Sequence, residues 1–250
     1  MKITIEYNHD TYRVDTSKPI GISTTISSGG SSPNAYFLPA PDIKPFAGEN
    51  FVLTVESGAP VNCETLLLAP HGNGTHAECV GHISKERVFI ADVMKEFLFV
   101  AHVVTVTPTQ QESDYIITKE ELATVLPDII PPVVVIRTLP NNPDKPSRNW
   151  SGTNPVYLEA DAALLCNQHG VQHLVVDFPS VDREEDGGML QAHHAFWGYP
   201  ENTRHHATIT EMAYIPNEVP DGMYLIQFHI IDVESDASPA KLVLYNLENV

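Results

Sequence analysis

The alternation of apolar and polar residues predicts strands along much of the chain. Residues 2–14 alternate in this way around a short polar turn. Residues 62–69 end in an apolar run that is typical of a strand in a sheet interior. Further strands are predicted at residues 51–55, 97–106, 133–137, 171–178, 207–214, 223–233 and 242–245.

Helical signals are fewer. Thr118 and Glu121 have the spacing of a capping box, which predicts a short helix after Thr118. Residues 157–169 have helical apolar spacing, and Gly170 is placed to end that helix. Two more short helices are predicted at residues 88–97 and 189–197. Because strands outnumber helices and no repeat or long linker is present, we expect a single α/β domain, residues 1–250, with a large sheet.

Residues 1–45 are expected to form an N-terminal strand and loop arm. Four prolines between residues 33 and 45 exclude a helix there. Tyr36, Phe37 and Phe46 offer apolar surface to bury and predict an ordered loop or lid, and a mobile surface loop is the alternative.

Composition narrows the classes of partner. The chain has 14 Lys and Arg against 32 Asp and Glu, a formal charge of −18, which excludes nucleic acid and anionic membranes as natural partners. With 42% hydrophobic residues the chain is expected to fold rather than to remain disordered. Three cysteines do not form a disulfide framework, and no targeting or membrane segment is apparent. A cytoplasmic protein that acts on a small molecule is the expectation.

Seven of the twelve histidines fall in two short windows. The first holds His71, His76 and His82, and in an extended strand His76 and Glu78 would share one face. An imidazole and a carboxylate so placed can ligate one divalent ion, although isolated histidines are usually ordinary surface or core residues. The second window, residues 191–211, includes His193 and ends at Glu211. Spacing alone leaves both interpretations open.

The first window resembles a known motif. The segment HGNGTHAECVGH is similar to H-x-G-T-H-x-D-x-P-x-H of the metal-dependent cyclase family, which includes bacterial kynurenine formamidase and isatin hydrolase. The resemblance extends from about residue 62 to residue 245. Its further matches are Arg137-Thr138, Ser180-Val181-Asp182, Ala192-His193, Thr210-Glu211 and Asp236-Ala237-Ser238-Pro239.

The resemblance implies a site and a fold. It implies that His71, His76 and Glu78 bind one metal ion. It implies further that Glu78 bridges to a second ion, where one is bound, which is completed by His193 and Glu211. His82 would act as general acid and base. The implied fold is a mixed, mostly antiparallel sheet flanked by helices, of the swivelling β/β/α type, in a homodimer or homotetramer.

Four departures from the family pattern mark a divergent branch. His71 lies five residues before His76, where the pattern has four, and Glu78 replaces an aspartate. Val80 replaces the proline, and the spacing from His193 to Glu211 is longer than usual.

Nitrogen and carboxylate ligands suit Zn²⁺, with Mn²⁺ as an alternative, and one or two ions are expected. The predicted function is hydrolysis of a small amide, formamide or lactam, as in an arylformamidase of tryptophan catabolism. A cyclase or dehydratase (a lyase) using the same metal, or a non-catalytic small-molecule-binding protein, are the alternatives. No G-x-S-x-G motif is present to support a serine hydrolase.

Several neighbouring residues have two interpretations. Cys79 follows Glu78 on the predicted strand, so its thiol should face the other way and pack as a small apolar group, with a metal ligand as the alternative. Trp197 either lines a substrate pocket with Tyr36 and Phe37 or belongs to the core. The acidic run that begins at Asp182 is expected to be a solvated loop, with support of its own turn as the alternative role for Asp182.

Overall fold

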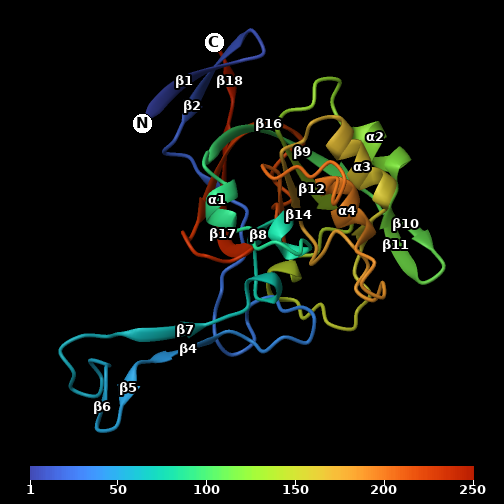
Figure 1. Ribbon diagram of the computed structural model, residues 1–250. Helices are drawn as coiled ribbons and strands as arrows, with labels where there is room; N and C mark the ends of the chain where they lie inside the picture. The colour runs from blue at the N-terminus through green and yellow to red at the C-terminus, as the bar shows by residue number, and fades with distance from the viewer.

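Seven strands close into a barrel at the centre of the molecule. The computed structural model describes residues 1–250, and Figure 1 shows the barrel with its flanking elements. In order around the barrel the strands are β16 (Gly222–Ile230), β9 (Leu98–Val106), β12 (Val133–Thr138), β14 (His173–Val176), β15 (Thr208–Glu211), β8 (His76–Cys79) and β17 (Ala237–Asn246), which pairs again with β16. The three pairings from β9 to β15 are parallel, and the other four are antiparallel. The predicted large, mixed and mostly antiparallel sheet is confirmed; its closure into a barrel was not predicted.

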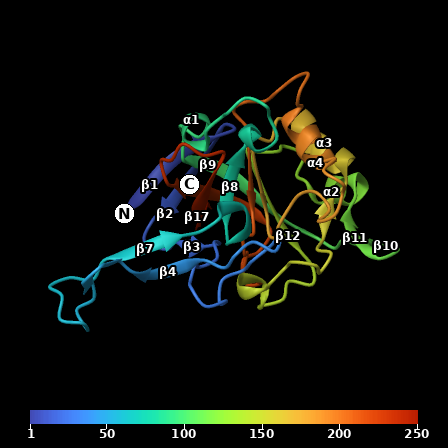
Figure 2. The same cartoon turned by 60° about the horizontal axis from the view of Figure 1, so that its bottom comes forward.

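Helices cover one side of the barrel. α2 (Lys119–Val125), α3 (Ala160–Gln168) and α4 (Gln191–Trp197) lie together there, and α1 (Ile90–Val93) lies on the opposite side (Figures 1 and 2). The capping box is confirmed, because Thr118 accepts a hydrogen bond from the Glu121 amide while Glu121 accepts one from the Thr118 amide. No helix has the length and apolarity needed to cross a membrane.

The strand β12 explains why the sheet is so apolar. Its side chains are buried on both faces. Val133 and Val135 pack inside the barrel against β9, β16 and β17, whereas Val134 and Ile136 pack beneath the helices. A strand covered on both faces needs an unbroken apolar run, and this is what the sequence shows between residues 133 and 136.

Shorter elements lie outside the barrel. The N-terminal strands predicted from alternation form a hairpin that pairs with the C-terminus. The small elements are β1 (Lys2–Tyr7), β2 (Asp10–Asp15) and β18 (Glu248–Asn249) in one sheet; β10 (Thr109–Gln111), β11 (Asp114–Ile117) and β13 (Tyr157–Leu158) in another; β3 (Ile20–Gly21) beside β17; and the 3-10 turn η3 (Lys145–Ser147).

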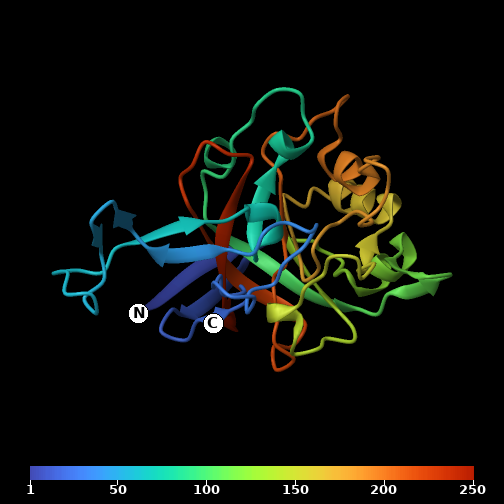
Figure 3. The ribbon, with the colours of Figure 1, turned by 90° about the horizontal axis from the view of Figure 1, so that it is seen from below.

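Residues 42–67 form a protruding hairpin, which we call the arm. Its base pairs β4 (Asp42–Pro45) with β7 (Glu64–Leu67), and its tip pairs β5 (Ala47–Gly48) with β6 (Phe51–Val52). Figure 3 shows it extending away from the barrel. The prediction of a sheet-interior strand at residues 62–69 is therefore wrong, since Leu66 and Leu67 are 60% and 70% exposed. The apolar run was read correctly as a strand, but nothing in it tells whether a body of protein covers it.

The loop before the arm also differs from expectation. It is ordered around a half-buried Tyr36, but Phe37 is 77% exposed and Phe46, in the arm, is 46% exposed. The expectation that all three aromatic rings are buried is wrong for Phe37 and Phe46. Tyr36 is held because its hydroxyl donates to the carbonyl of Pro179 at 3.2 Å.

A buried histidine should make the fold sensitive to acid. His173 lies between Phe99 and Phe228, and burial lowers its pKa to about 3. The unfolded chain, with a histidine pKa of about 6.5, binds this proton at higher pH, so stability falls as the pH drops from about 6.5 towards 3. We expect His173→Gln to reduce that dependence by up to about 1.4 kcal/mol per pH unit. Urea unfolding at pH 7 and pH 4.5 checks this, and equal acid losses in both proteins would contradict it.

Candidate metal centre

The strand β8 carries the centre of a buried cluster of histidines and carboxylates. All four of its residues are buried between β15 and β17. Strand alternation puts Ala77 and Cys79 in an apolar cluster with Ile90, on the side away from Glu78. The Cys79 thiol donates to the carbonyl of Val88 at 3.4 Å and packs as a small apolar group, as alternation predicted.

Two 3-10 turns fold the chain back at the ends of β8. η1 (Pro70–Gly72) carries His71, and η2 (Val80–His82) ends at His82. The two imidazole rings stack with their centroids 4.2 Å apart. The extra residue between His71 and His76 is accommodated by this turn and by Gly74, whose φ of +134° favours glycine.

Elements from the second histidine window complete the cluster. His193 extends from α4, and its Nε2 lies 3.1 Å from Oε1 of Glu78. Glu211, at the end of β15, is paired in register with His76, and its Oε2 lies 3.5 Å from His76 Nε2. The six residues predicted for the site are thus brought together: His71, His76, Glu78, His82, His193 and Glu211.

An outer partner fixes one nitrogen of each imidazole. Nδ1 of His193 lies 2.6 Å from Oδ2 of Asp182, and Nδ1 of His76 lies 3.0 Å from the carbonyl oxygen of Gly74. Nε2 of His71 lies 2.8 Å from Oδ2 of Asp236. The second nitrogen of each ring then faces a glutamate of the cluster. Metal-binding histidines have this arrangement, because the outer hydrogen bond sets the tautomer and the ring orientation.

Two buried atoms at the centre have no hydrogen bond. These are Nε2 of His76, which faces Oε2 of Glu211 at 3.5 Å, and Oε2 of Glu78, which faces Nδ1 of His71 at 3.0 Å without the geometry of a hydrogen bond. Because the Gly74 carbonyl can only accept, it takes the Nδ1 proton of His76 and leaves a lone pair on Nε2. A buried lone pair that faces a carboxylate is costly without a positive partner between them. A divalent cation fits this need.

Ligand atoms of the cluster are close enough to share an ion. One group consists of His71, His76 and Glu78, and another of Glu78, His82 and His193, with the ligand atoms of each within 4.8 Å of one another. Nitrogen and carboxylate oxygen without a thiolate suit zinc or manganese. Glu78 belongs to both of these groups, and a third group consists of His71, His82 and Asp236.

The carboxylates make the cluster attract positive charge. Burial alone would lower the pKa of His193, but the carboxylates of Asp182 and Glu78 raise this pKa to about 10. Burial likewise opposes a charge on His71, yet Asp236 and Glu78 raise its pKa to about 10. Burial would raise the pKa of Glu78, but the facing His82 and His193 hold it well below the usual range. The carboxylates of the cluster therefore favour positive charge on the groups around them.

Two carboxylates of the cluster were not predicted as site residues. Asp182 is 7% exposed, and its carboxylate accepts hydrogen bonds from the backbone amides of Ala192 and His193. These amides lie in the first turn of α4, so Asp182 holds the start of that helix and orients His193. Its assignment to a solvated loop is wrong. Asp236 contacts both His71 and His82, at 2.8 and 3.3 Å. Both aspartates occur in segments that match the family, which was the one signal available.

Three other residues considered in the sequence lie outside the ligand cluster. Trp197 is fully buried in the core beneath the helices, and its indole donates to the carbonyl of Ala207. His205 and His206, which also fall in the second histidine window, are exposed.

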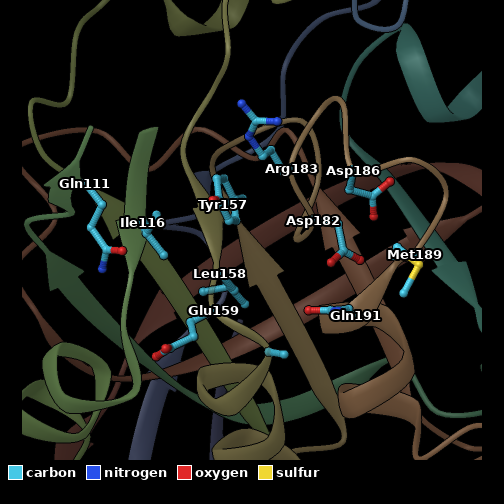
Figure 4. Close-up of a pocket in the computed structure, with 11 residues that line it drawn as sticks. Gln111, Ile116, Tyr157, Leu158, Glu159, Asp182, Arg183, Asp186, Met189 and Gln191 are labelled. Atoms are coloured by element: carbon cyan, nitrogen blue, oxygen red, sulfur yellow. The ribbon is translucent and has the colours of Figure 1, made fainter. Parts of the chain in front are cut away.

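A cavity of about 440 Å³ opens onto the cluster. Its lining includes Tyr36 and Leu38 on one side and His71, His82 and His193 at its base. A second cavity, of about 300 Å³, is shown in Figure 4, and both are bordered by Asp182. The first cavity is lined by His71, His82, His193 and Glu211 of the cluster and the second by none of these, so the first is the candidate substrate site.

Comparison with known proteins shows the family of this chain. The model of the family described as "Putative cyclase" matches residues 2–183, well over half of the sequence. The chain belongs to the cyclase family. The match includes the first histidine window and Asp182, whereas His193, Glu211 and Asp236 lie beyond it.

Solved cyclase-family structures share the fold at low sequence identity. A structure described as a predicted metal-dependent hydrolase from Bacillus stearothermophilus is 16% identical, with a TM-score of 0.63 over 91% of this chain and 98% of that one. An isatin hydrolase bound to the product analogue thioisatinate is 13% identical, with a TM-score of 0.64 over 92% and 93%. Isatin hydrolase A from Labrenzia aggregata, bound to benzyl benzoate, is 12% identical, with a TM-score of 0.65 over 92% and 94%. These neighbours include metal-dependent hydrolases, and the chain is a divergent member of the family.

Proposed function

We propose that this protein is a metal-dependent hydrolase of a small amide, formamide or lactam. The observation that carries the proposal is the buried Nε2 of His76, which has no hydrogen bond, in a ligand cluster that adjoins a cavity. We propose His71, His76, Glu78, His193 and Glu211 as the residues that hold one or two ions, Zn²⁺ in the first place and Mn²⁺ as the alternative. Such an ion polarises a carbonyl and makes a water molecule more acidic.

His82 is proposed as the general acid and base. Its side chain is 31% exposed and lines the cavity, and its Nε2 lies 3.9 Å from Oε2 of Glu78. The ring can therefore reach both the ligand cluster and a bound substrate. In hydrolysis it would take a proton from the attacking water and return that proton to the leaving nitrogen. The carboxylate of Asp236 on the opposite side of the ring, 3.3 Å from Nδ1, would hold it in this orientation.

The charges of the cavity favour a substrate without an anionic group. Arg183 is the one Lys or Arg side chain in its lining, and the guanidinium is already paired with Asp114 and the carbonyl of Glu185. Carboxylates of Glu184 and Asp186 also border the cavity. A substrate carboxylate would find no free cation there, apart from the ion itself. An uncharged aryl formamide or a cyclic lactam fits better.

The test is a substrate series measured on protein loaded with Zn²⁺ or Mn²⁺. We expect turnover of formanilide and isatin, and a lower kcat/KM for N-formylanthranilate, which carries a carboxylate and no ammonium group. Product formed in ¹⁸O-labelled water should contain one solvent oxygen. Turnover without solvent oxygen would instead indicate a lyase or cyclase, and binding of the series without turnover would indicate a non-catalytic binding protein. Preference for N-formylanthranilate would contradict the charge argument, whereas preference for N-formylkynurenine, a zwitterion, would support an arylformamidase of tryptophan catabolism.

Asp236 should act as a positioning residue for His82. Because its carboxylate contacts both His82 and His71, we expect Asp236→Asn to lower kcat about 10-fold to 100-fold with a smaller change in KM. Asp236→Glu, which keeps the charge, should recover part of the loss. Metal content by mass spectrometry is measured alongside. A variant with unchanged kcat would show that Asp236 does not orient His82.

A further inference from the structure

A third cavity, of about 640 Å³, has basic side chains in its lining, and we call it the basic cavity. Its cations are Lys145 and Arg148, and the acid in its lining is Asp144. In the cavity at the metal centre and in the cavity of Figure 4, acidic side chains outnumber the single arginine, Arg183. Because the whole chain has a formal charge of −18, a cavity with more basic than acidic side chains stands out. Its volume is in the range of cavities that bind small organic molecules.

Arg148 is held in place and still has free donors. Its Nε and Nη2 donate to the carboxylate of Asp144 at 3.0 and 2.8 Å, and its Cζ lies 4.6 Å from the centroid of the Trp150 ring. These contacts orient the guanidinium, and no hydrogen bond within the chain involves Nη1. An oriented guanidinium loses less side-chain entropy when it binds a carboxylate. Nη1 can therefore donate to an anion while the pair with Asp144 is kept.

Lys145 supplies the second positive charge in the wall of this cavity. Its side chain is 5% exposed, and Nζ donates to Oδ2 of Asp177 at 2.7 Å and to the carbonyl and hydroxyl oxygens of Thr138. Burial lowers the pKa of Lys145, the carboxylate of Asp177 opposes this, and the Arg148 guanidinium lowers the pKa further. The two cations are therefore close enough to repel each other, and both would attract an anion in the cavity.

The rest of the lining combines amide groups with apolar surface. Asn142 is exposed and its side chain makes no hydrogen bond within the chain, and Asn149 uses its Oδ1 to accept from the amide of Ser151. Amide N–H groups beside a guanidinium are donors that suit the two oxygens of a carboxylate. The apolar part of the wall suits a ring, and it consists of Pro108, Leu139, Pro140, Pro155 and Val156.

We propose that the basic cavity binds a small organic acid, a carboxylate carried on a ring. The carboxylate would accept hydrogen bonds from Nη1 of Arg148 and from the amides of Asn142 and Asn149, and the ring would lie against the apolar part of the wall. No residue lines both the basic cavity and the cavity at the metal centre, so this is a second site. The proposal does not depend on the proposed hydrolase activity.

The test is calorimetric titration of the zinc-loaded chain with benzoate, benzamide and inorganic phosphate, repeated on protein stripped of metal and dialysed. We expect one benzoate site that remains in the stripped protein, with a Kd of about 1 mM or below. Benzamide, which lacks the charge, and phosphate, which lacks the ring, should each bind at least about 10-fold more weakly. Benzoate binding that disappears with the metal would place the carboxylate on the ion and overturn the proposal. Benzamide or phosphate bound as tightly as benzoate would overturn the class of ligand.

Two substitutions locate the site. Arg148→Gln removes the free donors and the charge, and Asn142→Asp adds a carboxylate to the lining without removing a contact within the chain. We expect each to raise the Kd for benzoate at least about 10-fold. Arg87→Gln is the matched control and should leave the Kd unchanged, because the Arg87 guanidinium also lies over an aromatic ring, 5.0 Å from the Phe89 centroid, outside the basic cavity. Circular dichroism establishes that each variant is folded. Benzoate bound equally by the wild type and both cavity variants would show that the site lies elsewhere and overturn the proposal.

Discussion

Replacing Glu78 by alanine is expected to abolish metal binding. Its two oxygens lie 3.1 Å from Nε2 of His193 and 3.0 Å from Nδ1 of His71, so the two ligand groups that contain Glu78 lose a member. In the wild-type chain an ion at a thousand-fold excess over its Kd stabilises the fold by about 4 kcal/mol. We expect Glu78→Ala to remove this stabilisation, so that its melting temperature no longer responds to zinc or to a chelator. Mass spectrometry should find less than one tenth of the wild-type metal.

Glu218→Ala is the matched control for this loss. Glu218 is an exposed carboxylate that belongs to none of the ligand groups, and its removal should leave the zinc response unchanged. If Glu78→Ala retained a full equivalent of zinc, the proposed ligand set would be wrong. If neither protein bound zinc or manganese, the metal-dependent function itself would be excluded.

Local sequence spacing predicted the part of this site that one strand supplies. His76 and Glu78 are two residues apart, and two residues is the repeat of a strand, so their common face followed directly. The same rule placed Cys79 correctly on the apolar side. His71 needed the turn η1 as well as the strand, and its position could be predicted only from the family resemblance.

The position of Asp236 in the site could not be predicted from the spacing of residues along the sequence. It reaches His71 and His82 because β17 pairs with β8, with Ala237 opposite Glu78. That pairing depends on the order of strands around the barrel, which no local pattern in either segment specifies. Asp182 was misassigned for a related reason. Its acidic neighbours are typical of a solvated loop, and only the docking of α4 buries its carboxylate against His193.

The apolar run of the arm likewise shows that a sequence pattern predicts a strand but not what packs against it. Leu66 and Leu67 have the composition of a buried strand, and they do form a strand. Whether such a strand is covered by its own chain or by another copy depends on tertiary contacts, which the pattern does not encode.

Replacing His82 by glutamine separates catalysis from metal binding. The ring lines the cavity, is 31% exposed, and lies farther from Glu78, at 3.9 Å, than His71 or His193 does. We therefore expect His82→Gln to keep its metal and lose about 10²-fold to 10⁴-fold in kcat, the usual contribution of general acid and base catalysis, with KM changed little. His193→Gln is the comparison, because it should lose metal and activity together. Metal lost from His82→Gln would make His82 a ligand, and full activity with metal retained would assign the proton transfer to another group.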